Sequence, residues 1–159
     1  DLVYSINTNP DSRRLMVSAW APHEMNDMAL PPCHYAFQVY INNGVMDLMW
    51  QQRSADVFLG LPYDISMYGL LLEMLAKGAD LKAGQLIGQL GDCHLYNNHL
   101  EQAKVYLNRP NIPASPKVNI DYGIFMDTAN CLYIPDSSEI KLTNYNPLPA
   151  IKAELSVGK

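Results

Sequence analysis

Residues 34–53, HYAFQVYINNGVMDLMWQQR, decide how the middle of this chain folds. The segments His34–Ile41 and Val45–Arg53 are rich in Tyr, Phe, Val and Trp, which favour extended strands. Asn42-Asn43-Gly44 lies between them and is a strong signal for a tight hairpin turn, because Asn and Gly tolerate positive φ. We therefore expect two neighbouring antiparallel strands.

The segments nearest to this hairpin predict a strand before it and a helix after it. Residues 15–20 (LMVSAW) follow the break Asn9-Pro10-Asp11 and are typical of a short buried strand. A turn at Gly60-Leu61-Pro62 precedes Tyr63–Lys77, where the leucines and methionines leave little polar face. This pattern predicts a buried helix.

The rest of the chain predicts shorter elements. Leu86–Leu90 favours a strand, and His94–Asn108 favours an amphipathic helix that ends before Pro110. Lys117–Ile120 and Glu139–Leu142 are weak strand candidates between prolines. Strands and helices mix without regular alternation, so the expected class is α+β with a largely buried mixed sheet in one domain.

Composition excludes several functions. The 159 residues, 48% of them hydrophobic, suffice for one core, and no apolar run approaches the roughly 20 residues of a membrane span. Without a signal-peptide pattern, we expect a cytoplasmic protein. The net charge of −5 argues against nucleic-acid binding. The three cysteines form no CxxC pair and the histidine spacing is poor for ligands, so we expect free thiols and no metal.

Cys33 follows a rigid Pro-Pro pair at the start of a predicted strand, so its thiol is held in place. A lone cysteine is more often a small buried hydrophobe than a nucleophile. Two arginine-bearing segments change this weighting, residues 11–14 (DSRR) and 51–56 (QQRSAD), because guanidinium groups bind phosphate and favour a thiolate. Each segment also has a plainer interpretation: Arg13-Arg14 could be a solvated pair, and Arg53 could cap backbone carbonyls at a strand end.

Six ordered motifs resemble the thymidylate synthase family: DSRR (11–14), VSAW (17–20), MALPPCH (28–34), QRSADVFLGLPYDI (52–65), LGDCHLYNNHLEQ (90–102) and NYNPLPAIK (144–152). The resemblance extends over nearly the whole chain. It implies a thymidylate synthase-like mixed sheet with buried helices and a homodimer formed through the sheet. The family's N-terminal portion is missing from the match, so we expect residues 1–159 to be the C-terminal portion of a single catalytic domain.

The resemblance implies that Cys33 adds to C6 of a pyrimidine nucleotide, and that C5 then attacks the methylene of 5,10-methylenetetrahydrofolate. It assigns His34 and Gln52 to the base, and Asp56 to holding the folate and ordering the site, with Leu30 also on the folate side. Without the resemblance, these polar residues would be ordinary sheet-end side chains.

The resemblance also assigns the remaining substrate contacts. Arg53 and Ser54 would bind the 5′-phosphate, and Arg13 and Arg14 would reach it from the other subunit. The sugar 3′-hydroxyl would bind two residues of the LGDCHLYNNHLEQ motif, His94 and Tyr96. A bare H-x-Y pattern is otherwise a polar cluster at a helix start.

Asp64 departs from the family, in which asparagine ordinarily occupies this position. An asparagine amide pairs with O4 and N3–H of uracil, whereas a carboxylate accepts from N4 and from a protonated N3 of cytosine. Aspartate is typical of the family's dCMP hydroxymethylases, commonly phage enzymes, although an acidic residue also suits the first turn of a helix.

The sequence thus favours hydroxymethylation of dCMP over the use of dUMP. The alternatives are a thymidylate synthase that methylates dUMP, and a catalytically incomplete homologue with a binding or regulatory role.

Overall fold

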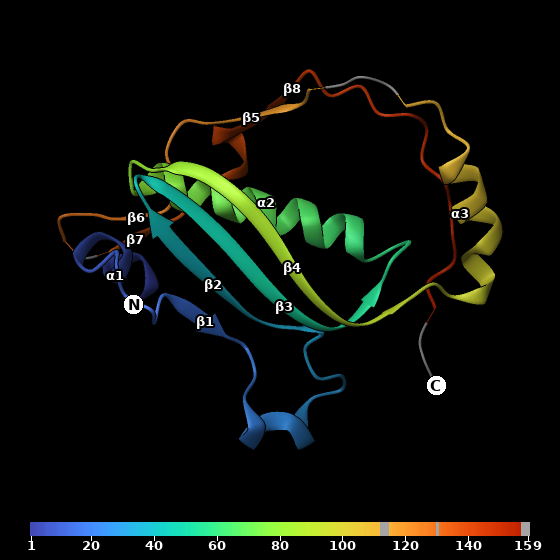
Figure 1. Ribbon diagram of the computed structural model, residues 1–159, viewed down its shortest axis with the longest axis horizontal. Helices are drawn as coiled ribbons and strands as arrows, with labels where there is room; N and C mark the ends of the chain where they lie inside the picture. Colours follow the sequence, from blue (N-terminus) through green and yellow to red (C-terminus); the bar gives the residue numbers. More distant parts are fainter. Residues whose placement is uncertain (112–114, 130, 157–159) are drawn as a thin grey trace.

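The computed structural model describes residues 1–111, 115–129 and 131–156 (Figure 1). The helices are α1 (Leu2–Thr8), α2 (Leu61–Gly78) and α3 (Leu100–Leu107), with 3-10 turns at Pro22–Asp27, Asn97–His99 and Ser137–Glu139. The strands are β1 (Met16–Ser18), β2 (His34–Asn42), β3 (Val45–Asp56), β4 (Lys82–His94), β5 (Lys117–Ile120), β6 (Phe125–Met126), β7 (Leu132–Tyr133) and β8 (Ile140–Thr143).

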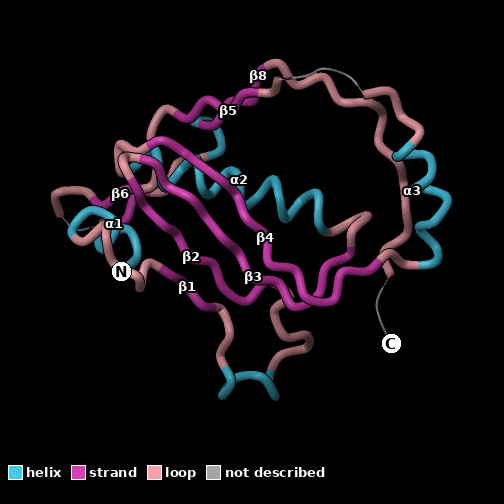
Figure 2. The backbone as a smooth tube through the Cα atoms, viewed as in Figure 1, coloured by secondary structure: helices cyan, strands magenta, loops and turns pink. Residues whose placement is uncertain are grey.

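The central sheet has the order β1-β2-β3-β4 and is mixed (Figure 2). β1, β2 and β3 are antiparallel neighbours, and β4 lies parallel to β3. The hairpin between β2 and β3 is confirmed: Asn43 (φ 49°) and Gly44 (φ 77°) both have positive φ, as a type I′ hairpin turn requires. A parallel pair needs a crossover, and α2 supplies it between β3 and β4.

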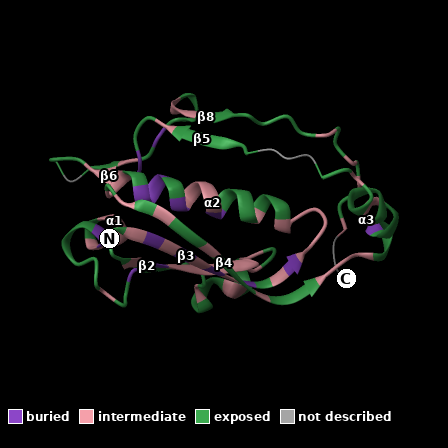
Figure 3. Cartoon of the chain, turned by 45° about the horizontal axis from the view of Figure 1, so that its top comes forward, coloured by how far each residue is buried: buried purple, intermediate pink, exposed green. Residues whose placement is uncertain are grey.

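The core lies between this sheet and α2, which runs along one face of the sheet (Figure 3). Alternate residues of β3 point to that face and are buried, among them Met46, Leu48 and Trp50. Their partners on α2 include Tyr68 and Leu72. The α+β class with a mixed sheet and a covering helix is therefore confirmed.

The opposite face of the sheet carries exposed apolar side chains. Met16, Tyr40 and Ile87 are 52%, 62% and 41% exposed on it. The strand predicted at 15–20 forms at Met16–Ser18, but its predicted burial is wrong, because Leu15 is buried and β1 itself is exposed. The α2 helix is buried toward its C-terminal end, at Met74–Ala76, and where Tyr68 and Leu72 pack, whereas N-terminal residues such as Tyr63 are exposed, so the prediction of a buried helix is only partly confirmed.

The predicted helix at His94–Asn108 is wrong over its first six residues. β4 extends to His94 because it pairs with β3 along its length, and helix α3 begins only at Leu100. Strand pairing removes His94 from the expected helix, and Asn97–His99 form a 3-10 turn before α3. The predicted strand at 86–90 is the middle of the longer β4, and the strands at 117–120 and 139–142 correspond to β5 and β8. Helix α1 was not predicted.

The C-terminal end of α2 is clamped by the loop before β6. A Cβ atom added at Gly78 would lie 1.8 Å from the carbonyl oxygen of Ile124, and one added at Gly123 would lie 2.0 Å from the amide nitrogen of Gly78. The amide of Ile124 also donates to the carbonyl of Met74 at 2.8 Å. Two glycines thus allow two backbones to touch, and this contact fixes the end of the helix.

Alanine substitutions at two glycines of α2 should therefore have opposite effects. Gly78→Ala should lower the free energy of unfolding by more than about 2 kcal/mol, because backbone atoms block the new methyl group. Gly69→Ala should raise it by about 0.5–1 kcal/mol, because its Cβ would meet only Leu86 Cδ2 at 3.7 Å. Urea unfolding of both variants measures the change in the free energy of unfolding. Equal changes would contradict the close backbone contact inferred at Gly78.

Candidate active site

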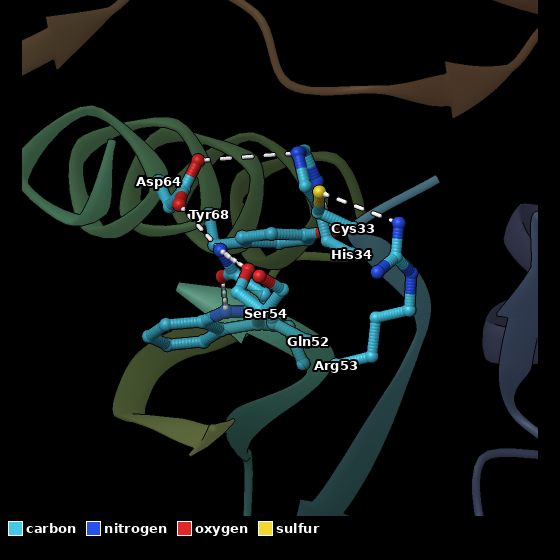
Figure 4. A network of polar contacts seen from close by, with 8 residues as sticks. Cys33, His34, Gln52, Arg53, Ser54, Asp64 and Tyr68 are labelled. Carbon is cyan, nitrogen blue, oxygen red and sulfur yellow. Dashed lines mark hydrogen bonds and ion pairs between the residues drawn. The ribbon is translucent and has the colours of Figure 1, made fainter. Parts of the chain in front are cut away.

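Cys33 lies in the loop before β2 and is partly buried beside Arg53 of β3 (Figure 4). The amide of Arg53 donates to the carbonyl of Cys33 at 2.8 Å. The guanidinium donates to the carbonyls of Pro31 (2.9 Å) and Pro32 (3.1 Å), and its Nη2 lies 3.9 Å from Cys33 Sγ. One arginine therefore holds the Pro-Pro loop and places a fixed positive charge next to the thiol.

A bulge in β2 turns His34 toward the same face as Gln52. His34 pairs with Gln52, and Ala36 pairs with Gln51, so Tyr35 is the extra residue of β2 at this point. An extra residue reverses the alternation of side chains beyond it. His34 Nδ1 consequently lies 3.2 Å from the hydroxyl of Tyr68 on α2, and its Nε2 lies 3.9 Å from Asp64 Oδ1.

Gln52 and Asp64 form the polar centre beside His34 (Figure 4). Gln52 Nε2 donates to Asp64 Oδ2 at 2.9 Å and to the carbonyl of Ser54 at 3.0 Å. Gln52 is 4% exposed, so these bonds are made away from bulk water and hold their geometry. One oxygen of Asp64 is thereby committed to the protein, and the other faces His34.

Tyr68 connects this centre to the core. Burial raises the pKa of its hydroxyl, and the negative charge of Asp64 raises it further. Tyr68 is therefore protonated at neutral pH, and its hydroxyl can donate to His34 Nδ1. In that arrangement His34 carries its own hydrogen on Nε2, which faces Asp64.

Asp56 and His94 lie opposite each other at the carboxyl ends of the parallel strands β3 and β4. Asp56 Oδ1 accepts from the amides of Phe58 (3.0 Å) and Leu59 (3.3 Å) and so holds the turn that leads into α2. The rings of His94 and Tyr96 meet edge to face, 4.9 Å apart. The side chains expected to bind folate and sugar therefore lie at the same sheet edge as Ser54.

The structure does not bring Arg13 and Arg14 to Cys33 within one chain. Both are exposed, and they precede Met16, which pairs with Gln38 in the middle of β2, away from the end that bears Cys33. Leu30 is 73% exposed in the Pro-Pro loop. The roles of these three residues therefore remain expectations from the family resemblance.

Sequence reasoning missed Tyr68 and Trp50. Tyr68 lies four residues after Asp64 on α2, and this spacing places both on one face of the helix. Trp50 lies two residues before Gln52 on β3, so both point to the same side of the sheet, and Trp50 Nε1 donates to Gln52 Oε1 at 3.1 Å. The two spacings were readable in the sequence, but the contacts depend on how α2 crosses the sheet.

An apolar groove of about 600 Å³ lies between β2 and α2, with His34 and Tyr68 among its lining residues. Cys33, Cys93 and Cys131 are free thiols. Within residues 1–111, 115–129 and 131–156, no helix is long and apolar enough to cross a membrane, and no group of three His, Cys, Asp or Glu could hold a metal ion.

The fold and site together define an α+β protein with a cysteine held beside a guanidinium, next to a histidine, an amide and a carboxylate. The family model described as Thymidylate synthase matches residues 1–157. The chain belongs to the thymidylate synthase family, which confirms the resemblance found in the sequence.

Its relatives include a thymidylate synthase of Listeria monocytogenes, 46% identical over 157 residues, and a thymidylate synthase of Listeria innocua, 46% identical over 158 residues. Each alignment covers 99% of this chain and 48% of the relative. The chain thus spans about half the length of the curated relatives it matches.

The contact between Arg53 and Cys33 predicts the reactivity of the thiol. Arg53→Gln should slow alkylation of Cys33 by iodoacetamide several-fold at neutral pH, because the positive charge 3.9 Å from Sγ, which attracts the negative charge of the reacting sulfur, is lost. Peptide mass spectrometry against time measures the rate at each cysteine. Cys93 is exposed and serves as the internal control. An unchanged rate at Cys33 would show that the guanidinium does not activate the thiol.

Proposed function

We propose that this protein transfers a one-carbon unit from 5,10-methylenetetrahydrofolate to C5 of a pyrimidine nucleoside monophosphate, with Cys33 as the nucleophile. The observation that carries the proposal is the placement of Arg53 against Cys33, in a chain of the thymidylate synthase family. The names of the relatives favour thymidylate synthesis from dUMP over the dCMP hydroxymethylation that the sequence favoured.

The chain's own residues account for the first bond-forming step. The Cys33 thiolate adds to C6 of the pyrimidine, and the electron pair of the C5–C6 double bond moves toward the ring carbonyl, which makes C5 nucleophilic. His34, Gln52 and Asp64 lie where they can hydrogen-bond the ring as this charge develops. After C5 has bonded to the one-carbon unit, loss of the C5 proton would expel tetrahydrofolate and leave an exocyclic methylene on the ring. A hydride from tetrahydrofolate, which becomes dihydrofolate, would reduce this methylene to methyl, and departure of the sulfur from C6 then restores the ring and the free thiol.

The residues at the sheet edge fit a folate. Asp56 uses Oδ1 for two backbone amides, and within the described residues its Oδ2 has no hydrogen-bond partner, so it is available to an amino group of the pteridine. Exposed Leu30 offers an apolar surface for a ring. When bound, 5,10-methylenetetrahydrofolate supplies the electrophilic one-carbon unit.

The remaining nucleotide contacts follow the same proposal. Arg53 is exposed, and together with Ser54 it can bind the 5′-phosphate at the mouth of the site. His94 and Tyr96 would bind the sugar hydroxyl. Arg13 and Arg14 would come from a second copy of the chain in a homodimer, and the open apolar sheet face with Met16, Tyr40 and Ile87 supports pairing through the sheet.

The second candidate is hydroxymethylation of dCMP, and the structure of Asp64 favours it. Gln52 gives its amide hydrogens to Asp64 Oδ2 and the Ser54 carbonyl, so Asp64 Oδ1 is left as an acceptor toward the ring. An acceptor suits the amino group of cytosine and opposes O4 of uracil. In this version water, instead of a hydride from folate, adds to the exocyclic methylene.

Cys33→Ser should abolish turnover of either nucleotide while the affinity for it stays nearly unchanged, because a hydroxyl is a far weaker nucleophile at neutral pH. Turnover and calorimetric affinity are measured on the complete protein. Cys93→Ser, which changes an exposed thiol, is the matched control and should keep full activity. Full activity in Cys33→Ser would exclude the mechanism.

Asp64→Asn should lower kcat/KM for dCMP and raise it for dUMP. The carboxylate stabilises a protonated N3, and a charge-assisted hydrogen bond of about 1.5–3 kcal/mol corresponds to roughly ten- to a hundred-fold in rate. Product masses and the absorbance of dihydrofolate distinguish methyl from hydroxymethyl transfer. A parent enzyme that already prefers dUMP would contradict the assignment of Asp64 to cytosine.

Mixing two inactive variants, Cys33→Ser and Arg14→Ala, should restore activity if the arginines act in trans. Half of the randomly formed dimers are mixed, and one of their two sites holds only parent residues, so recovery should approach about a quarter of the parent activity. Native mass spectrometry verifies subunit exchange. Each variant alone, treated identically, is the control. No recovery after proven exchange would show that the sites are not shared.

A further inference from the structure

Trp50 is held rigidly behind the candidate site. It is 3% exposed, and its ring is stacked on Tyr68 with centroids 5.3 Å apart and planes 12° apart. Its partner on β4 is Gly88, and a Cβ added there would lie 2.5 Å from the Cη2 atom of the indole. The indole is therefore packed between Gly88 of β4 and the ring of Tyr68 on α2, and this packing fixes the direction of its N–H.

The N–H of Trp50 determines how the amide of Gln52 is turned. Indole nitrogen only donates, so the carbonyl oxygen of Gln52 must face it, at 3.1 Å. The backbone carbonyl of Ser54 only accepts, and it receives Gln52 Nε2 at 3.0 Å. Both neighbours impose the same orientation, in which the second amide hydrogen points at Asp64 Oδ2, 2.9 Å away.

We propose that Trp50 is a positioning residue for base recognition: its N–H holds Gln52 with an amide hydrogen on Asp64 Oδ2, and so keeps Oδ1 turned toward the base. Because Gln52 presents only donors to position 64, the atom of residue 64 that faces it must be an acceptor. The other carboxylate oxygen of Asp64, 3.9 Å from His34 Nε2, then reads the base. This inference rests on the proposed function.

A role in packing alone makes a different prediction. The indole fills the space over Gly88, so a change that removes its ring would disturb the core and weaken binding of every nucleotide together. Loss of the N–H alone would instead leave the packing intact and the Gln52 oxygen without its donor. The two roles are therefore separated by the ratio of affinities for the two bases.

The test replaces Trp50 in the complete protein with benzothienylalanine, which keeps the bicyclic ring but has sulfur in place of N–H. The Kd and kcat/KM ratios between dCMP and dUMP should move toward unity by about three- to ten-fold, with the melting temperature nearly unchanged. The same replacement at Trp20, which is 40% exposed, is the matched control and should leave the ratio alone. Trp50→Phe should move the ratio in the same direction.

A double-mutant cycle tests whether Trp50 changes the base preference through Asp64. In an Asp64→Ala background the benzothienylalanine replacement should no longer change the base ratio. An unchanged ratio in the parent, or an equal change in both backgrounds, would overturn the proposal. Calorimetric Kd values need no turnover, so a protein that binds both nucleotides but transfers no carbon refutes the proposed function and still tests Trp50. A protein that binds neither nucleotide refutes both.

Discussion

The register of the β2–β3 hairpin is the constraint on which the site depends. The two-residue turn at Asn43-Gly44 sets it, and the bond from the Arg53 amide to the Cys33 carbonyl closes its far end. A slip of one residue would move every side chain to the other face of the sheet. The bulge at Tyr35 shifts the register by one residue at this point only, so the side chain of His34 lies with that of Gln52 on the side covered by α2.

The site depends equally on the parallel pairing of β4 with β3. It brings α2 across the sheet as the connecting helix, and the first turn of α2 carries Asp64 to Gln52. It also puts Gly88 under the Trp50 ring. Local turn chemistry and long-range strand pairing are thus both needed before any of the polar residues meet.

Local patterns were enough to predict the hairpin, the middle of β4 and most of α2, because these depend on turn residues and periodicity. They failed at residues 94–99, where His94 ends β4 and Asn97–His99 form a 3-10 turn, and at Met16–Ser18, where the expected strand forms but is exposed. Cys33 and Arg53 were recognised from their motifs. The roles of Tyr68 and Trp50 could not be predicted, because their contacts form only when α2 lies on the sheet.

The central claim is that Cys33 attacks C6 of a pyrimidine nucleotide before carbon transfer, and trapping the adduct tests it most directly. A 5-fluoropyrimidine nucleoside monophosphate has no C5 proton to lose, so its reaction with 5,10-methylenetetrahydrofolate should stop with the enzyme still attached. Peptide mass spectrometry of the complete protein should then find nucleotide and folate together on the peptide that contains Cys33. An adduct at another residue, or turnover of the ordinary nucleotide with no trapped species at Cys33, would contradict the account.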